Sequence, residues 1–181
     1  DRNITLFNEM IKGYCNANEI EDALKLFKEM KNENISPNIV TFTIIIDYYC
    51  KSGEMKKAEE FFKKMENFDV KPNIITYTSL INGYFKIKNV EKVEQLLNEM
   101  SKYNIEPNIT TYNTLLNGYL SIRNFEKANE LFLKMNEKQM VDVVTYNTFI
   151  KSCFEQKNIK KAKETFEEMI KKNIKPNIKT F

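Results

Sequence analysis

The 181-residue chain contains no histidine and only four glycines and four prolines. Without histidine it lacks the commonest general base and the commonest metal ligand, which argues against catalysis and against a metal site. The scarcity of glycine and proline favours helices over a turn-rich sheet protein. No apolar run approaches the roughly 18–20 residues that a membrane-spanning helix needs. We therefore expect an all-helical protein with no catalytic residue, cofactor, small-molecule substrate or membrane partner.

The charge balance is also slight. A net charge of +3 is far from the strongly basic composition of proteins that hold nucleic acid mainly through its phosphates, so any nucleic-acid affinity must depend on the bases. Hydrophobic residues make up 42% of the chain, enough for a folded core. The three cysteines, Cys15, Cys50 and Cys153, are odd in number and lack metal-ligand spacing, so we predict buried, reduced thiols.

Comparison of the chain with itself reveals a repeat of 35 residues, with one step of 34. Segments such as Ile74-Ile-Thr-Tyr-Thr78 and Val143-Val-Thr-Tyr-Asn147 recur at this spacing, and a methionine that follows each of them keeps the same step. A fixed period of 20–50 residues is typical of repeat architectures. We assign the units to residues 4–38, 39–73, 74–108, 109–142 and 143–177, with 178–181 beginning a sixth.

Each unit has the pattern of a helical hairpin. In the third unit, Tyr77, Leu80, Ile81 and Tyr84 follow the i, i+3, i+4, i+7 spacing of one apolar helix face, and residues 90–100 repeat that pattern. The few residues between the two stretches allow only a tight turn. The fourth unit lacks the proline that its siblings have, and we expect its interhelical loop to absorb this deletion.

A lone hairpin cannot bury its apolar faces, so such units are expected to stack on one another in a solenoid. A small residue holds one place in every second helix, where we predict a close helix crossing. These residues are Ala23, Ala58, Val93, Ala128 and Ala162. The chain starts without a methionine and stops four residues into a unit, which is the pattern of a piece of a longer array.

Two places in each unit are restricted to short hydrogen-bonding side chains. The fifth residue is always Asn or Thr, and the last is always Asn or Asp. The fifth, ninth and thirteenth residues form one polar stripe on the first helix. Both places have a simpler interpretation: Asn and Thr near a helix start can cap free N–H groups, and the last residue could be a loop or helix-capping residue only. The third residue of the second to fifth units is a threonine, which we interpret as a plain helix cap. These threonines are Thr41, Thr76, Thr111 and Thr145.

The unit from Ile74 to Asn108, with its Thr-Tyr-Thr-Ser-Leu-Ile-Asn-Gly-Tyr opening and its Ile-Glu-Pro-Asn close, resembles the pentatricopeptide repeat in its plain 35-residue form. It lacks the Trp and Leu-Gly signature of the tetratricopeptide repeat. The resemblance covers essentially the whole chain. It implies a right-handed superhelical solenoid that binds single-stranded RNA, one base per repeat, in a mitochondrion or plastid.

In this family the fifth and last residues of a repeat specify its base: fifth-place Thr goes with purines and Asn with pyrimidines, while last-place Asn goes with amino bases and Asp with keto bases. Carried over residue by residue, this implies the site 5′-(C/U)AAU(C/U)-3′, with the N-terminus at the 5′ end. The pairs are Asn8 with Asn38, Thr43 with Asn73, Thr78 with Asn108, Asn113 with Asp142, and Asn147 with Asn177.

The family also implies residues that hold the bases and the phosphates. The second residues of neighbouring units sandwich each base, and a basic thirteenth residue, present here as Lys51 and Lys86, contacts phosphate. Thr and Lys depart from the usual aliphatic residue at the sandwiching place. The sandwiching residues are Thr5, Val40, Ile75, Thr110, Val144 and Lys179.

Two other functions compete with RNA binding. A protein-binding solenoid would cradle a peptide or partner protein between its helices, but it would not need two restricted polar places per repeat. An enzyme such as a zinc deaminase would need histidine ligands, which this chain cannot supply. Carboxylate pairs such as Glu59-Glu60 are interpreted as solvated helix faces.

Overall fold

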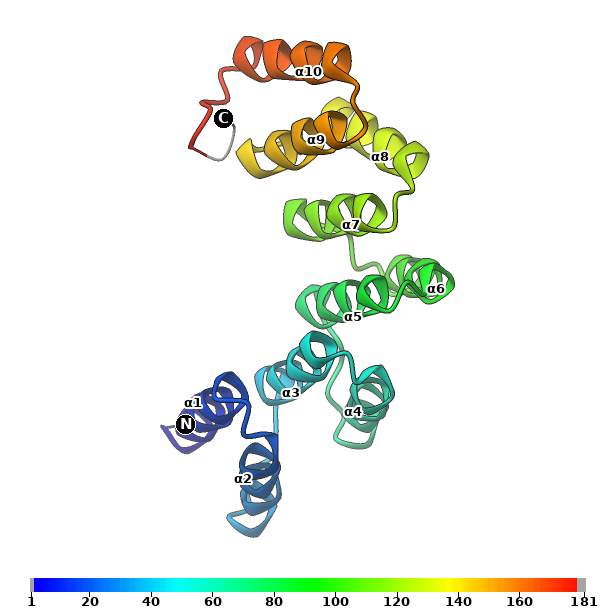
Figure 1. Ribbon diagram of the computed structural model, residues 1–181. Coiled ribbons are helices and arrows are strands. Elements are labelled where there is room, and N and C mark those ends of the chain that lie inside the picture. Colours follow the sequence, from blue (N-terminus) through cyan, green and yellow to red (C-terminus); the bar gives the residue numbers. More distant parts are fainter. Residues whose placement is uncertain (1, 179–181) are drawn as a thin grey trace. The chain divides into compact units, whose positions relative to one another are not determined.

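The computed structural model describes residues 2–178 and contains, within that range, ten helices and no strand (Figure 1). The helices form hairpins, which confirms the all-α prediction. The chain divides into two compact units, unit 1 with residues 1–106 and unit 2 with residues 107–181. Unit 1 contains α1 (Arg2–Asn16), α2 (Ile20–Asn32), α3 (Ile39–Ser52), α4 (Met55–Asn67), α5 (Ile74–Lys86) and α6 (Val90–Lys102). Unit 2 contains α7 (Ile109–Ser121), α8 (Phe125–Glu137), α9 (Val143–Glu155) and α10 (Ile159–Lys171).

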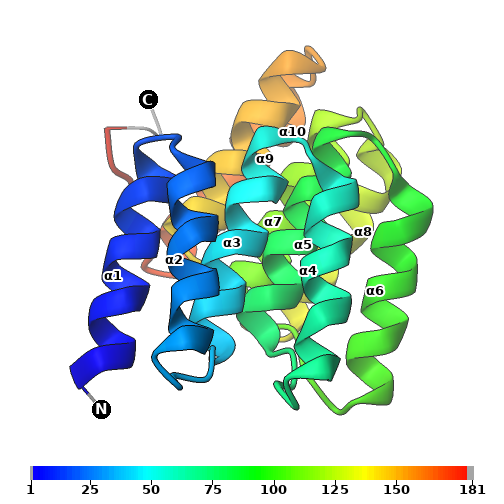
Figure 2. The ribbon, with the colours of Figure 1, turned by 90° about the horizontal axis from the view of Figure 1, so that it is seen from below.

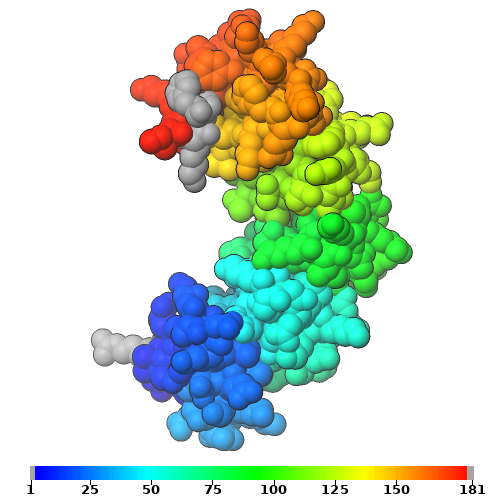
Figure 3. All heavy atoms as spheres, viewed as in Figure 1, coloured from blue at the N-terminus to red at the C-terminus, as the bar shows by residue number. Residues whose placement is uncertain are grey.

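Within unit 1 the first helices of the hairpins form a continuous layer. Helix α3 packs against both α1 and α5, and each first helix also packs against its own second helix (Figures 1 and 2). Consecutive hairpins of unit 1 lie in direct contact along the chain order (Figure 3). In unit 2, α7 packs against α8 and α9, and α9 packs against α10. Each unit is therefore held together by contacts between neighbouring hairpins, as expected of a repeat protein.

The core of each unit is built from the residues that repeat. The predicted crossing residues of the second helices, such as Ala58 and Ala162, have 0–1% of their surface exposed, and the marker methionines, such as Met65, are equally buried. Aromatic rings fill the space between hairpins. The rings of Phe27 and Phe42 lie 5.6 Å apart edge to face in unit 1, and Phe132 stacks on Phe149 at 4.1 Å in unit 2.

The loop after each second helix has a fixed geometry. After α4, Asp69 adopts the left-handed conformation (φ 55°), and the Val70 N–H donates to the Met65 carbonyl at 2.9 Å. This is a Schellman ending, which satisfies a carbonyl at the helix terminus and brings an apolar residue back onto the helix. Extended backbone at Asn73 then begins the next hairpin. The Ile or Val two residues before each proline thus lies at the Schellman position that favours an apolar contact with the helix.

The short fourth repeat keeps its register in the way the sequence predicts. Residues 103–108 join α6 to α7, whereas residues 138–142 join α8 to α9, one residue fewer. Met140 still donates its N–H to the Met135 carbonyl at 2.8 Å, and Asp142 still directly precedes α9. The deletion therefore falls between the Schellman ending and the start of the next helix and disturbs neither.

The cysteines are all free. Cys50 and Cys153 are buried, which confirms the prediction for those two, while Cys15 is only half-buried. Burial raises the pKa of Cys50 to about 12, so its thiol stays protonated at neutral pH. Cys50 lies against Gly83 at the contact between α3 and α5.

We predict that Gly83→Ala destabilises the chain. A Cβ added at Gly83 would lie 2.9 Å from the Cys50 Cβ and 3.0 Å from its Sγ, so α3 and α5 would have to separate. Overpacking of this kind costs about 1–3 kcal/mol, which exceeds the gain of up to about 1 kcal/mol in helix propensity. Urea unfolding followed by circular dichroism measures the difference.

Gly13→Ala is the matched control. Gly13 is also in a first helix, but an added Cβ there would meet nothing within 4 Å. Its replacement should therefore raise stability by roughly 0.5–1 kcal/mol through helix propensity alone. Equal effects of the two substitutions would show that the close approach of α3 to α5 is not the cause.

Candidate nucleic-acid interface

The last residue of a repeat caps the first helix of the next. The first N–H groups of a helix have no carbonyl partner within it, and an Asn or Asp side-chain oxygen can accept their hydrogen bonds. Asn73 Oδ1 accepts from the N–H groups of Ile75 and Thr76 at 3.0 and 3.1 Å. The capping interpretation is thus confirmed for four of these residues, which are Asn38, Asn73, Asn108 and Asp142.

Capping fixes how each of these side chains is turned. Because backbone N–H groups can only donate, the oxygen of a capping Asn must face the helix, and its Nδ2 must face away from it. The Nδ2 groups of Asn38 and Asn73 make no hydrogen bond to any other described residue. An Asn at this place therefore offers a donor to the surface, whereas Asp142, an ionised carboxylate, offers acceptors only.

The structure brings most of the predicted base-specifying pairs together. Hydrogen bonds join the fifth-place Nδ2 to the last-place Oδ1 in three of them. Thr43 Oγ1 instead lies 3.0 Å from Thr76 Oγ1, which in turn lies 3.2 Å from Asn73 Oδ1. Thr78 belongs to unit 1 and Asn108 to unit 2, so this pair remains a prediction. The directly bonded pairs are Asn8 with Asn38 at 3.3 Å, Asn113 with Asp142 at 3.2 Å, and Asn147 with Asn177 at 3.0 Å.

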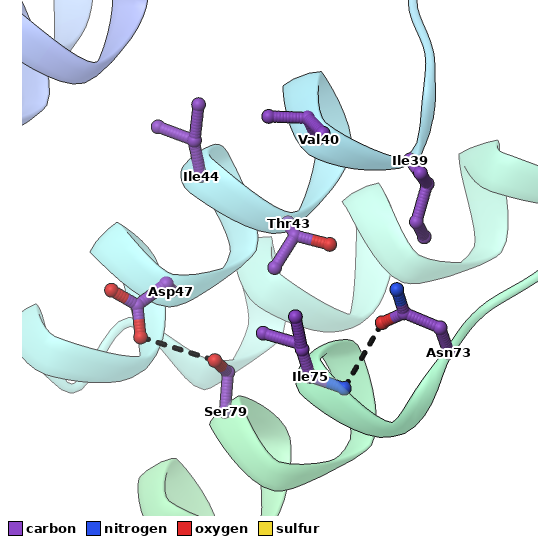
Figure 4. A pocket seen from close by; sticks show the side chains of 8 residues that line it. All are labelled: Ile39, Val40, Thr43, Ile44, Asp47, Asn73, Ile75 and Ser79. Carbon is purple, nitrogen blue, oxygen red and sulfur yellow. Dashed lines mark hydrogen bonds between the residues drawn. The ribbon is translucent and has the colours of Figure 1, made fainter. Parts of the chain in front are cut away.

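A pocket of about 350 Å³ lies beside the pair Thr43 and Asn73. Figure 4 shows residues from α3 and from the start of α5 around it. Val40 and Ile75, the residues predicted to sandwich the second base, line the pocket and are 49% and 59% exposed. Exposed aliphatic side chains cost free energy in water, so they favour a flat apolar partner between them. All four residues that the sequence assigns to the second base line one pocket.

The pocket also contains residues to which the sequence assigns no role. Ser79 donates to Asp47 Oδ1 at 3.1 Å, and both line the pocket with Ile39 and Ile44 (Figure 4). Asp47 is the ninth residue of its repeat, and the sequence shows it only as part of the polar stripe. Its contact with Ser79 joins residues 32 positions apart, which spacing within one repeat cannot reveal.

The other residues predicted to sandwich bases occupy the equivalent place in their own first helices. Thr5, Thr110 and Val144 are exposed near the starts of their first helices, and Val144 is 53% exposed. Asn8, by contrast, is only 6% exposed, while its partner Asn38 is half-buried. Lys179 lies outside the described residues.

The two predicted phosphate-contacting lysines differ in their surroundings. Lys51 Nζ lies 2.6 Å from Asp47 Oδ2 in an i, i+4 ion pair, while Lys86 Nζ donates to the Lys51 carbonyl at 3.1 Å across α3 and α5. Both side chains are at the surface. The charge of Lys51 is partly balanced by Asp47, so the ion pair weakens the attraction of Lys51 for an anion.

Asp142 is held in its charged form. Burial raises the pKa of its carboxyl, but hydrogen bonds from the Thr145 backbone, from the Asn113 amide and from the Val144 backbone outweigh burial, so the pKa lies below its ordinary value. At neutral pH this side chain therefore accepts hydrogen bonds and donates none.

Metal-ligating side chains do not gather in the part of the chain that the structure describes: it contains no group of three or more His, Cys, Asp or Glu that could hold an ion. None of the described helices is long and apolar enough to cross a membrane.

Comparison with known proteins identifies the repeat. The model of the PPR repeat family matches five segments that together cover residues 2–181. The chain belongs to the PPR repeat family. The matched segments are residues 2–47, 37–86, 72–120, 107–140 and 141–181. A search of curated proteins found no match.

Solved PPR structures share the fold. The pentatricopeptide repeat protein PPR10 in complex with an 18-nt psaJ RNA element is 27% identical with a TM-score of 0.78, over 89% of this chain. The structure of PPR10 from maize has a TM-score of 0.71 at the same sequence identity. This chain spans 24% of PPR10 in both. The PPR domain of Arabidopsis thaliana PRORP1 in complex with tRNA has a TM-score of 0.70 at 18% identity. The match covers 98% of this chain and 94% of that domain.

We predict that Asp142 makes stability depend on pH at the acid end. Its folded-state pKa lies below the value of about 3.9 for an unfolded Asp, so its ionisation stabilises the folded chain above that pH. The contribution is lost as pH falls through the folded-state pKa. Urea unfolding of wild type and Asp142→Asn between about pH 2 and pH 7 should show the stability difference change only at the acid end.

Asp142→Asn is a suitable reference because Asn is also a good helix cap, as Asn73 shows in α5. A stability difference that stays constant down to pH 2, or an Asp142 pKa at or above about 3.9 by NMR titration, would contradict this assignment.

Proposed function

We propose that this chain binds single-stranded RNA with one base per repeat and selects the sequence 5′-YAAUY-3′, where Y is C or U. The observation that carries the proposal is the pocket between α3 and α5, in which Val40, Thr43, Asn73 and Ile75 surround a space open to one base. The support from relatives is that PPR10 has been solved bound to an RNA element and the PPR domain of PRORP1 bound to tRNA.

The capping geometry supplies a physical reason for discrimination by the last residue. On their pairing edges, U and G carry a ring N–H, while A and C carry a bare ring nitrogen that accepts hydrogen bonds. The outward Nδ2 of Asn73 donates and suits A or C, whereas the ionised Asp142 accepts and suits U or G. Asn73 therefore supports A at the second base and Asp142 supports U at the fourth.

The surroundings of the pairs favour RNA over a protein partner. A peptide groove would require neither a donor at Asn73 nor an acceptor at Asp142 at the equivalent place of different repeats. From family membership we further propose that the protein acts in a mitochondrion or plastid, in RNA processing, stability or translation. We propose no enzymatic activity for these residues.

We predict that Asp142→Asn moves the preference at the fourth base from U towards C. The substitution replaces an acceptor with a donor while keeping the cap on α9, so selection should change more than stability. Base-edge contacts discriminate by about 1–3 kcal/mol, so the U-to-C affinity ratio should change by roughly 5- to 150-fold. Fluorescence anisotropy with 5′-CAAUC-3′ and 5′-CAACC-3′, each in the same flanking sequence, measures the ratio.

The complementary sequence 5′-RAUUR-3′, where R is A or G, is the control for RNA binding itself. Equal and weak binding of wild type to this RNA and to 5′-YAAUY-3′ would contradict the RNA proposal and favour a protein partner. A second outcome is that wild type binds selectively while Asp142→Asn leaves the fourth-base ratio unchanged. In that case RNA binding stands and the proposed role of Asp142 is wrong.

We predict that Lys86→Ala and Lys51→Ala weaken all RNAs alike. Because each substitution removes one cation that binds phosphate, it should reduce the slope of log affinity against log salt by about 0.7 for a single strand. Asp47→Asn should have the opposite effect and strengthen all RNAs, because it releases Lys51 from its ion pair. Salt titrations of the three variants against one RNA measure the slopes.

Lys25→Ala serves as the control for loss of positive charge. Lys25 pairs with Asp22 on the second helix α2, away from the predicted pairs. If Lys25→Ala lowers affinity as much as Lys86→Ala, the effect comes from net charge and the local role of Lys86 is wrong.

A further inference from the structure

The third-place threonines are more than plain caps. Thr41, Thr76, Thr111 and Thr145 have no exposed surface. Thr41 Oγ1 donates to Asn8 Oδ1 at 2.6 Å, and Thr145 Oγ1 donates to Asn113 Oδ1 at 2.7 Å. Each of these bonds reaches from one repeat to the fifth residue of the repeat before it. A buried hydroxyl must be hydrogen-bonded, and here its partner is a residue proposed to read a base.

The donors in this contact can be assigned around Asp142. The backbone N–H of Asp142 can only donate, and it lies 3.2 Å from Thr145 Oγ1, so that oxygen accepts there. The single hydroxyl proton of Thr145 is then left for Asn113 Oδ1, its closest acceptor. Asn113 Nδ2 completes the ring by donating to Asp142 Oδ1 at 3.2 Å.

The reversed Asn113 amide is excluded by the same contacts. Turned over, it would place its oxygen against Asp142 Oδ1, so that two acceptors would face each other with no proton between them. The arrangement of Asn8 with Thr41 and Asn38 is the same: Asn38 N–H donates to Thr41 Oγ1 at 3.1 Å, and Asn8 Nδ2 donates to Asn38 Oδ1. Both Asn amides are therefore held in one orientation.

We propose that Thr145 and Thr41 are positioning residues that make the preceding Asn select pyrimidines, an inference that rests on the proposed RNA binding. With Asn113 Oδ1 held by Thr145, the amide offers a base the second proton of Nδ2. Both pyrimidines carry a carbonyl oxygen at C2 that accepts this proton, and neither purine does. A reversed amide would offer an oxygen, which suits the C2 amino group of G.

The second repeat, which has Thr43 at the fifth place, lacks this lock, by which we mean the hydrogen bonds that fix the amide in one orientation. Thr76 Oγ1 lies 3.2 Å from Asn73 Oδ1 and 3.0 Å from Thr43 Oγ1, but among the described residues no reciprocal bond from the Asn73 N–H reaches it. Its proton can go to either oxygen, so Thr43 can donate or accept. The lock therefore accompanies Asn at the fifth place in the pairs of Asn8 and Asn113.

Thr145→Val tests the inference because it keeps the shape and removes the hydroxyl. The preference for U over G at the fourth base should fall by about fivefold or more, since Asn113 Oδ1 then has no donor and the amide, held only through Asp142, can rotate out of this orientation. The preference for U over C should persist, because Asp142 still caps α9 through the Thr145 N–H. Thr145→Ser, which restores the hydroxyl, should restore the U-to-G ratio. Anisotropy titrations with U, C or G at that base measure all three.

Thr165→Val is the matched control for loss of a buried hydroxyl. Thr165 is 2% exposed and donates only within its own helix, to the Lys161 carbonyl at 2.8 Å. It should lower stability by a similar amount without changing any base ratio. If Thr145→Val behaves like Thr165→Val, with an unchanged U-to-G ratio, Thr145 is merely structural and the inference is overturned.

The outcomes separate this inference from the function on which it rests. Wild type that does not distinguish U from G or C at the fourth base contradicts the proposed function itself. If Thr145→Val does not fold, Thr41→Val provides the same test in unit 1, where it should reduce selection of a pyrimidine over G at the first base and leave the fourth unchanged. Retained selection of a pyrimidine over G at the first base in that variant would overturn the inference.

Discussion

The cap at the start of each first helix is the interaction on which the candidate interface depends. A helix leaves its first N–H groups without partners, and in α3, α5, α7 and α9 an Asn or Asp oxygen accepts from them. This local requirement sets the orientation of the side chain. It also decides which chemical group remains for a ligand, because the oxygen is used and the other terminal atom is not. Helix stability and the proposed base recognition thus use opposite sides of one residue.

Much of the fold could be predicted from the sequence because repetition makes a weak local pattern strong. The 35-residue step places the hairpins, the small crossing residues and the deletion before Asp142, and the structure agrees with all three. From the sequence, a helix cap and a base-contacting residue look like alternative roles for the last residue. The sequence does not show that different atoms of one side chain can serve the two roles. Asn73 caps α5 with Oδ1, and its Nδ2 is left for the proposed contact with a base.

The parts that the sequence did not predict all involve contacts between repeats. The spacing of Thr145 to Asp142 fits a plain cap, but the bond from Thr145 to Asn113 joins residues 32 positions apart. No periodicity within a repeat contains that information. The ion pair of Lys51 with Asp47 is different, since its i, i+4 spacing on one helix is visible in the sequence and qualifies the phosphate role of Lys51.

These contacts explain how a chain with little net charge could select nucleic acid. With a net charge of only +3, and Lys51 partly balanced by Asp47, phosphate attraction is weak, so affinity must come from apolar contact and base-edge hydrogen bonds. Such bonds discriminate only when their donors and acceptors cannot turn to suit each ligand. The caps hold the last residues, and the threonines hold Asn8 and Asn113. Because each lock uses atoms from two consecutive repeats, the proposed base-contacting site is complete only where hairpins are stacked.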